Sequence, residues 1–114
     1  MITVMQRSDL LLAGSPTAKF IGAEHGADVS FFWVDTGPGK GLDLHWHPYT
    51  ETWIVLSGQV RIDADDETVT TGAGVVVTVG AETVHRFRNI GAENLKMVCI
   101  HASPEIIQDS VTEG

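Results

Sequence analysis

The sequence has few basic residues and almost no cysteine, and both shortages exclude classes of function. Seven lysines and arginines stand against fifteen aspartates and glutamates, which gives a formal net charge of −8 at pH 7. Nucleic acids are bound by basic stripes, and none is visible here, so we expect no nucleic-acid partner. Cys99 is the only cysteine, which excludes an intramolecular disulfide and is compatible with a reducing compartment. We expect Cys99 to be a small buried hydrophobic residue.

Long apolar runs are missing as well. No stretch approaches the roughly 18 apolar residues of a membrane span, and the N-terminus has neither a basic leader nor a convincing cleavage pattern. We therefore predict a cytoplasmic protein without membrane contact. Its 114 residues, 43% of them hydrophobic, suit a single domain over residues 1–114 with one hydrophobic core.

What the sequence does contain is a series of short runs rich in β-branched and aromatic residues. Glycine and turn residues separate them about every eight to twelve positions, a rhythm typical of an all-β sandwich or barrel. The runs predict strands at 29–35, 42–47, 52–58, 59–65, 67–71, 74–80, 84–90 and 95–101. We therefore predict one antiparallel β domain.

Three of these segments carry a more specific expectation. Val60, Ile62 and Ala64 alternate with polar residues, so they should share one face of their strand. The run 74–80 is apolar on both faces, so we expect it in the interior of the fold. The sequence DADDE at 63–67 predicts a hairpin turn.

Helical patterns are scarce, and the best one follows the last predicted strand. Ser103 is a favoured N-cap, Pro104 suits the first helical position, and Glu105 falls in the first turn. We predict a short C-terminal helix from this point.

Side chains that can bind a metal gather in the segment DLHWHPYTET at 43–52. His45 and His47 are two positions apart, so in a strand their side chains point to the same face. Glu51 can reach the same spot if it begins the next strand after the PYT bend. Two imidazoles and a carboxylate suit a divalent first-row metal. The alternative is a surface strand with incidental histidines.

A third histidine occurs in the run 84–90. His85 shares one strand face with Phe87 and Asn89, whereas Arg86 and Arg88 lie on the other. This pattern points His85 inward. Taken alone, an inward histidine is more often a satisfied core residue than a ligand.

The glycines and the metal-binding side chains recur at fixed spacings in two separate segments. The first reads Gly39, five residues, His45, one residue, His47, three residues, Glu51, six residues, Gly58; the second reads Gly74, five residues, Gly80, then His85, three residues, Asn89. The segments, about 39–58 and 74–89, resemble the two motifs of the cupin family. The resemblance covers roughly residues 30–102, most of the chain.

The first motif matches the family at every defining position, and the second departs from it at two. The family usually has proline where Gly80 stands and glycine where Glu82 stands. Those positions shape a turn and do not bind metal. The departure therefore concerns the loop geometry and leaves the expected ligands in place.

The resemblance implies a double-stranded β-helix, or jelly-roll barrel, with one divalent metal ion per chain inside its wider end. Carried over by position, the ligands are His45, His47, Glu51 and His85. An octahedral ion with four protein ligands keeps two positions open for a small oxygen-containing ligand, and such openness is typical of catalytic sites. Manganese, iron, nickel, zinc, cobalt and copper all accept these donors.

Four further residues near the motifs are candidates for supporting the ligands or contacting a substrate. They are His101, Phe87, Tyr49 and Trp53. Each also has a structural alternative, because His101 can simply end a strand and the three aromatic residues can pack in the core.

The strand that carries His45 is apolar on its other face as well. Leu42, Leu44 and Trp46 are expected to point away from the metal, and a solvated face would be polar. We therefore predict a homodimer that pairs through this face, as cupins frequently do. The alternative is that the N-terminal segment covers these residues within one chain.

Cupins that bind metals include dioxygenases, isomerases, decarboxylases and polyketide cyclases, and the fold does not choose among them. The resemblance implies a metal-dependent enzyme of oxygenase, isomerase or cyclase type that acts on a small oxygen-containing molecule. The alternative is a binding or sensing module in which the metal only anchors a small-molecule ligand.

Overall fold

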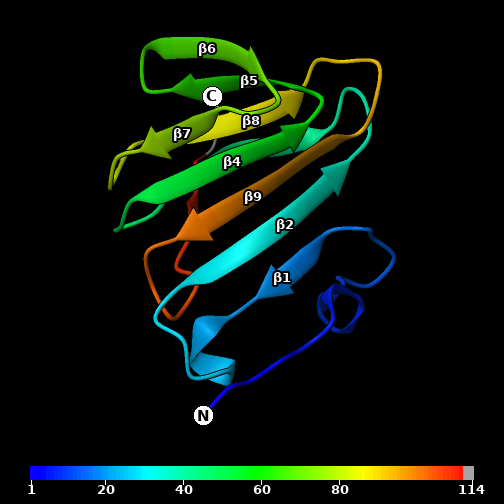
Figure 1. The fold of residues 1–114 in the computed structure, drawn as a ribbon. Helices are drawn as coiled ribbons and strands as arrows, with labels where there is room; N and C mark the ends of the chain where they lie inside the picture. Colours follow the sequence, from blue (N-terminus) through cyan, green and yellow to red (C-terminus); the bar gives the residue numbers. More distant parts are fainter. Residues whose placement is uncertain (112–114) are drawn as a thin grey trace.

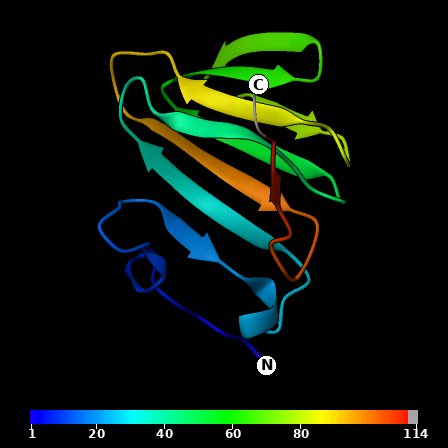
Figure 2. The same ribbon diagram turned by 180° about the vertical axis from the view of Figure 1, so that it is seen from behind.

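Two antiparallel five-stranded sheets make up the computed structural model, which describes residues 1–111 (Figures 1 and 2). Sheet A, in spatial order, contains β1 (Ala18–Phe20), β2 (Ser30–Thr36), β9 (Leu95–His101), β4 (Glu51–Ser57) and β7 (Val76–Val79). Sheet B contains β10 (Asp109–Ser110), β3 (Gly41–Trp46), β8 (His85–Asn89), β5 (Gln59–Ala64) and β6 (Glu67–Gly72). Two short 3-10 helices, η1 (Arg7–Leu10) and η2 (Gly22–Glu24), flank β1.

The eight strands predicted from the sequence are all present, from β2 to β9, and the all-β jelly-roll architecture is confirmed. The hairpin turn in DADDE lies between β5 and β6, with Asp65 in the left-handed region at φ 51°. Within residues 1–111, no helix is both long and apolar enough to span a membrane.

Inward-facing side chains of both sheets form the hydrophobic core. The buried cluster consists of Val34, Trp53, Val55, Val60, Ile62, Val79, Phe87, Leu95, Met97 and Cys99. Burial of a large apolar side chain contributes about 1.5–3 kcal/mol to stability. The expected alternation in β5 holds, because Val60 and Ile62 are buried on one face, and Cys99 is buried as predicted.

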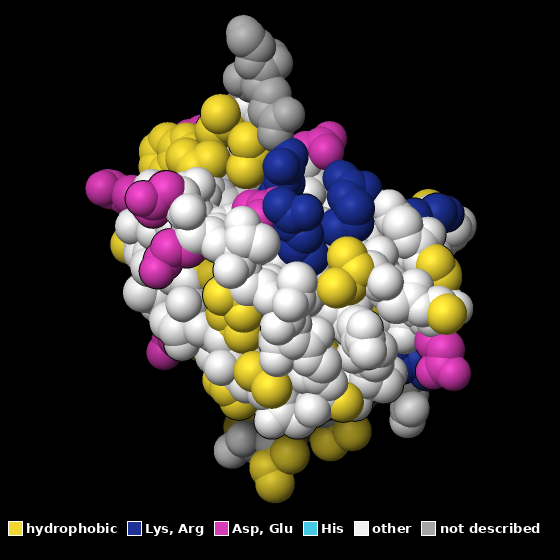
Figure 3. Space-filling model, turned by 90° about the horizontal axis from the view of Figure 1, so that it is seen from above, with side chains coloured by type: hydrophobic (Ala, Val, Ile, Leu, Met, Phe, Trp, Pro, Cys, Tyr) yellow, Lys and Arg dark blue, Asp and Glu magenta, His cyan; other side chains and the backbone are white. Residues whose placement is uncertain are grey.

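Basic side chains occupy the outer face of sheet B. Arg61, Arg86 and Arg88 alternate with buried residues of β5 and β8, and Figure 3 shows basic side chains gathered over these strands. Asp63 lies among them, with its carboxylate 3.2 Å from Arg61 Nε and 3.0 Å from Arg86 Nε. The outward direction predicted for Arg86 and Arg88, opposite His85, is therefore confirmed.

The predicted interior position of the run 74–80 is wrong. Its strand, β7, is the edge strand of sheet A, and Val76 is 63% exposed. Val79 is buried and Val77 packs against the core, whereas Val75 is exposed. The apolar outer face therefore reflects an uncovered sheet edge.

The predicted C-terminal helix after Ser103 is also wrong. Residues 102–105 form bends, and the chain then continues to the short strand β10, where Asp109 pairs with Trp46 of β3. Ser103 Oγ does accept a hydrogen bond from the Glu105 N–H at 3.1 Å, but it stabilises a turn. The backbone groups that a helix would use internally bond to other parts of the fold.

The predicted direction of Leu42 is wrong because β3 contains an irregularity. Leu42 pairs with Phe87 and His45 pairs with His85, with a register shift between the two pairs. The shift breaks the alternation of side chains, as a β-bulge does. Leu42 therefore lines the cavity between the sheets together with His45, although it is 42% exposed, while Leu44 and Trp46 remain half-buried on the other face.

Candidate metal centre

Three strand ends bring the predicted metal ligands together. His45 lies near the end of β3 with His47 just beyond it, Glu51 begins β4, and His85 begins β8. All four side chains are buried, and one ligand atom from each lies within 4.8 Å of the others. The β3–β8 pairing sets His45 directly opposite His85. Sheet pairing and one short bend therefore assemble a group that is dispersed in the sequence.

Backbone carbonyl groups fix the orientation of the three imidazole rings. The Nδ1 atoms of His45, His47 and His85 lie 2.7, 2.8 and 2.8 Å from the carbonyl oxygens of Asp43, Ile107 and Thr83. A carbonyl oxygen can only accept, so each Nδ1 carries the proton and donates it. In a neutral ring this leaves an Nε2 lone pair free for a metal, as is usual for ligating histidines.

The Glu51 carboxylate lies between the histidines. Its Oε1 is 3.0 Å from His85 Nε2 and 3.2 Å from His47 Nε2, and its Oε2 is 3.2 Å from His101 Nε2. Burial alone would raise the pKa of Glu51, but the close contacts of its carboxylate with His101, His47 and His85 outweigh it and lower that pKa far below its ordinary value. The carboxylate is therefore charged.

The rings of His47 and His85 test whether these residues fit a metal ion. Each has an oxygen acceptor beside both of its nitrogen atoms, whereas a neutral imidazole carries one proton. His47 Nε2 is buried and makes no hydrogen bond, although Glu51 Oε1 is 3.2 Å away. A cation between the Nε2 atoms and the carboxylate would satisfy both groups. The donor set of this candidate site therefore fits a divalent metal.

The electrostatic environment differs between the neighbouring histidines. Burial lowers the pKa of His45 below its ordinary value, against the opposing effect of the Asp43 carbonyl. Burial also acts on His47, but its contacts with Glu51 and with the Ile107 carbonyl raise the pKa of that ring overall. His45 is accordingly held neutral, in the form that can bind a metal.

Two of the residues singled out near the motifs connect to Glu51. His101, at the end of β9, pairs with Glu51 across sheet A, and its Nδ1 lies 2.6 Å from the Tyr49 hydroxyl. That hydroxyl accepts a hydrogen bond from the Ile107 N–H at 3.1 Å, and the Tyr49 ring stacks on His47 at 5.2 Å between centroids. Burial raises the pKa of Tyr49, so its hydroxyl stays protonated. His101 therefore contacts a candidate ligand directly.

The other two residues, Phe87 and Trp53, belong to the core and to a cavity at the same time. Their rings meet edge to face with centroids 5.6 Å apart, and both are almost fully buried. Both line a cavity of about 230 Å³ between the sheets. Core packing, the structural alternative for each, is thus compatible with contact to a ligand.

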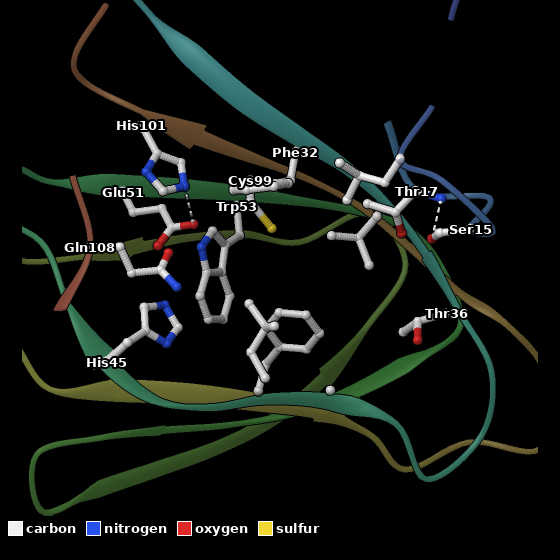
Figure 4. A pocket seen from close by; sticks show the side chains of 15 residues that line it. Ser15, Thr17, Phe32, Thr36, His45, Glu51, Trp53, Cys99, His101 and Gln108 are labelled. Carbon is white, nitrogen blue, oxygen red and sulfur yellow. Dashed lines mark hydrogen bonds and ion pairs between the residues drawn. The ribbon is translucent and has the colours of Figure 1, made fainter. Parts of the chain in front are cut away.

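The cavity has a polar end at the candidate metal site and an apolar middle. His45, Glu51, His101 and Gln108 lie together at one end (Figure 4). Apolar walls follow, contributed by Phe32, Leu42, Trp53, Phe87 and Cys99. Burial and the nearby Glu51 charge raise the pKa of the Cys99 thiol, which therefore stays neutral in the wall.

Several lining residues carry no signal in the sequence. Ser15, Thr17 and Thr36 border the end far from the metal site, and Gln108 borders the near end. Gln108 falls in the segment predicted as helix, and the acceptor for His47 is a backbone carbonyl, which no residue type reveals. The pairing of β10 with β3 and the hydrogen bonds of Ile107 with His47 and Tyr49 bring that segment to the site.

Comparison with known proteins agrees with this geometry. The cupin domain family matches residues 32–101. Polyketide synthase CurC of Streptomyces cyaneus is 38% identical over 68 residues, which are 59% of this chain and 44% of that protein. Quercetin 2,3-dioxygenase of Bacillus subtilis is 32% identical over 93 residues, 79% of this chain and 27% of that protein. The chain thus spans less than half the length of these curated relatives.

A solved structure gives the same fold. Oxalate decarboxylase of Bacillus subtilis, described with Mn(II) centres, superposes with a TM-score of 0.78 at 24% identity, over 90% of this chain and 29% of that chain. Likeness at this identity speaks for the fold alone. Because the family match spans well over half of its residues and includes all four candidate ligands, the chain belongs to the cupin family.

Proposed function

We propose that this chain is a metal-dependent cupin enzyme that acts on a small oxygen-containing molecule at an open metal site. One observation carries the proposal. Three imidazole Nε2 atoms and a charged carboxylate converge at the end of an apolar cavity, with each ligating ring fixed by a backbone carbonyl. A purely structural site would be closed by its ligands, whereas this one borders a cavity.

In this proposal His45, His47, Glu51 and His85 hold one divalent ion. The ion would supply Lewis-acid polarisation of a bound oxygen-containing group, or redox chemistry if it is iron, manganese or copper. The Mn(II) centres of the oxalate decarboxylase relative support manganese as one candidate. Iron, nickel, zinc, cobalt and copper accept the same donors.

The remaining polar residues would orient the ligands and manage protons. His101 Nε2 contacts Oε2 of Glu51, and the Tyr49 hydroxyl contacts His101 Nδ1. This chain of contacts leads from the site to a half-buried hydroxyl, so His101 Nε2 is the atom placed to exchange a proton with the Glu51 carboxylate. Phe87 and Trp53 would form the wall against which the substrate lies. The cytoplasmic location predicted from the sequence belongs to the same proposal.

A second candidate function is a binding or sensing module in which the metal only anchors a ligand. The relatives' enzymatic names concern much longer proteins, of which this chain matches less than half. Both candidate functions predict that the protein binds a small molecule, but only the enzyme converts it to a product.

Turnover separates them. Protein loaded in turn with iron and with manganese would be incubated in air with enediols, catechols, β-diketones and sugar derivatives, and products followed by mass spectrometry. We expect at least one compound to be converted by loaded protein and not by His47→Ala protein. Tight binding without conversion of any compound would favour the module.

A further inference from the structure

The size of the cavity limits what it can hold. An apolar cavity of about 150 Å³ is enough to bind benzene, and this one measures about 230 Å³. The difference leaves room for two or three further groups, since a water molecule in the liquid takes about 30 Å³. Drug-sized ligands occupy pockets of about 300–1,000 Å³. The cavity therefore suits one ring with a few small substituents.

The walls specify the chemistry of that ring. Leu42 and Phe87 from sheet B face Phe32 and Trp53 from sheet A, so the middle of the cavity is apolar and rich in aromatic edges and faces. A small dicarboxylate would leave these walls without contacts. An aromatic ring would contact all of them, and contacts between aromatic rings add stabilisation beyond the burial of area.

Trp53 supplies an unused hydrogen-bond donor in this wall. The side chain is 1% exposed, and its Nε1–H has no hydrogen-bond partner within residues 1–111. Trp53 is two positions after Glu51 on β4, so both point to the same side of sheet A. Figure 4 shows the indole nitrogen on the side of the ring that faces Glu51 and Gln108. The donor thus points toward the metal end.

A buried N–H without a partner is costly, so a group that accepts its hydrogen bond is expected in the bound state. A ligand oxygen at the metal end is in the right direction. Within residues 1–111 no protein group accepts this hydrogen bond, and Oε1 and Oε2 of Glu51 face the histidines.

We infer that the cavity binds a single-ring aromatic molecule with two adjacent oxygen atoms, a catechol-type ligand, and that Trp53 Nε1–H donates a hydrogen bond to one of those oxygens. The inference rests on the proposed function, because the two adjacent oxygens would bind the metal that His45, His47, Glu51 and His85 would hold. It goes further because it specifies that the ligand has one ring, names the residues that contact the ring, and assigns to Trp53 the hydrogen bond that selects the ligand. Trp53 is then a residue that determines specificity.

The test uses full-length protein loaded with zinc, which is diamagnetic, and catechol as the probe. The three tryptophans give three indole cross-peaks in a ¹H–¹⁵N spectrum, and Trp53→Phe identifies the one from Trp53. We expect catechol to shift that cross-peak in wild-type protein. In calorimetry, Trp53→Phe should bind catechol about tenfold more weakly, the usual effect of one lost hydrogen bond.

Two controls sharpen the comparison. Trp33→Phe changes an exposed tryptophan on β2 and should leave the affinity for catechol unchanged. A two-ring naphthalenediol keeps the adjacent oxygens but exceeds the room in the cavity, so it should bind at least tenfold more weakly than catechol. The spectrum of wild-type protein needs no substitution, so it decides the question even if Trp53→Phe folds poorly.

Catechol bound with an unmoved Trp53 cross-peak would overturn the inference and leave the metal-anchored site standing. Equal affinities for one and two rings, or no binding of catechol to zinc-loaded protein, would overturn it too. If the chain does not retain zinc, or if His85→Ala binds catechol as wild type does, then the proposed function fails and the inference with it.

Discussion

Two histidine rings at this site face more acceptors than they have protons to donate. His85 lies between the Thr83 carbonyl and Glu51 Oε1, and His47 lies between the Ile107 carbonyl and the same carboxylate oxygen. A second proton on each ring would place two cations in a buried cluster. A single divalent ion supplies the missing positive charge at one point. At the residue scale, this mismatch is the strongest sign of a metal.

Glu51 makes a testable contribution to the stability of the metal-free protein. Its pKa in the folded protein is lower than the ordinary value of 4.5, so below that pH the unfolded chain binds a proton that the folded chain does not. The stability from this group is present above pH 4.5 and lost as the pH falls. As the pH falls below 4.5, the free energy of unfolding of chelator-treated wild type should therefore decrease relative to that of Glu51→Gln, by up to about 1.4 kcal/mol per pH unit.

Urea unfolding of both proteins between pH 6 and pH 3 measures this difference. Gln imitates the protonated carboxyl, so the variant lacks the proton uptake and serves as the reference. A constant gap between the two proteins over this range would mean that the Glu51 carboxyl is not the charged, hydrogen-bonded group described above.

At the scale of single elements, the turn before β8 joins the two motifs. The Glu82 N–H donates a hydrogen bond to the His47 carbonyl at 2.7 Å, and the Thr83 carbonyl accepts the proton of His85 Nδ1. Glu82 adopts φ 63°, the left-handed region, where the family usually has glycine. The departure from the motif therefore keeps the backbone conformation and adds strain.

Replacing Glu82 with glycine should relieve that strain. A non-glycine residue in the left-handed region costs roughly 1–2 kcal/mol. Glycine also gives the unfolded chain more conformational freedom, which lowers the stability gained by about 0.4–1 kcal/mol. We expect Glu82→Gly to raise the free energy of unfolding by about 1 kcal/mol. Glu24→Gly, at an exposed position of helix η2, is the matched control and should not stabilise the protein. A destabilised Glu82→Gly protein would contradict this description of the turn.

The segment after Ser103 shows where local sequence signals fail. Its residues have the caps of a short helix, but the Ile107 backbone bonds at both its groups, to Tyr49 through its N–H and to His47 through its carbonyl. Partners about sixty positions away in the sequence override a local preference. No pattern within the segment itself reveals them.

Removing the chain after Glu105 should therefore weaken metal binding. His47 would lose the acceptor that orients its ring, and loss of such an outer partner typically costs 10–100-fold in affinity. Competition with a chromophoric chelator would measure the change. Unchanged affinity in the truncated protein, with its strands intact by circular dichroism, would mean that the segment does not support the site.

The same contrast explains which parts of the site could be predicted. Strand alternation is local, so it placed His45 and His47 on one face, and the resemblance of the two motifs to the cupin family added Glu51 and His85; the structure brings all four together. The direction of Leu42 was predicted wrongly because an irregularity in β3 breaks the alternation of side chains. No residue type in this segment indicates that irregularity. The cavity walls contributed by the N-terminal and C-terminal segments were not predicted either, because their positions depend on pairing between distant strands.

At the scale of the whole molecule, the prediction of a homodimer remains to be tested. Because Leu42 lines the cavity, the face expected to form the dimer contact consists of Leu44 and Trp46. Both point away from the metal site and are half-buried within one chain. An aspartate at Trp46 would place a charge in the contact, so Trp46→Asp should shift a dimer toward the monomer without changing the metal content. Light scattering that finds a strict monomer for wild type at high micromolar concentration would contradict the dimer.

The fold gathers His45, His47, Glu51 and His85 at one end of the cavity, where we propose that they hold one divalent metal ion. Metal analysis of protein purified without oxygen tests this proposal most directly. We expect about one divalent ion per chain in wild type and in His25→Ala, whose histidine lies outside the candidate site, and loss of most of the ion in His47→Ala. Full occupancy at unchanged affinity in His47→Ala would contradict it.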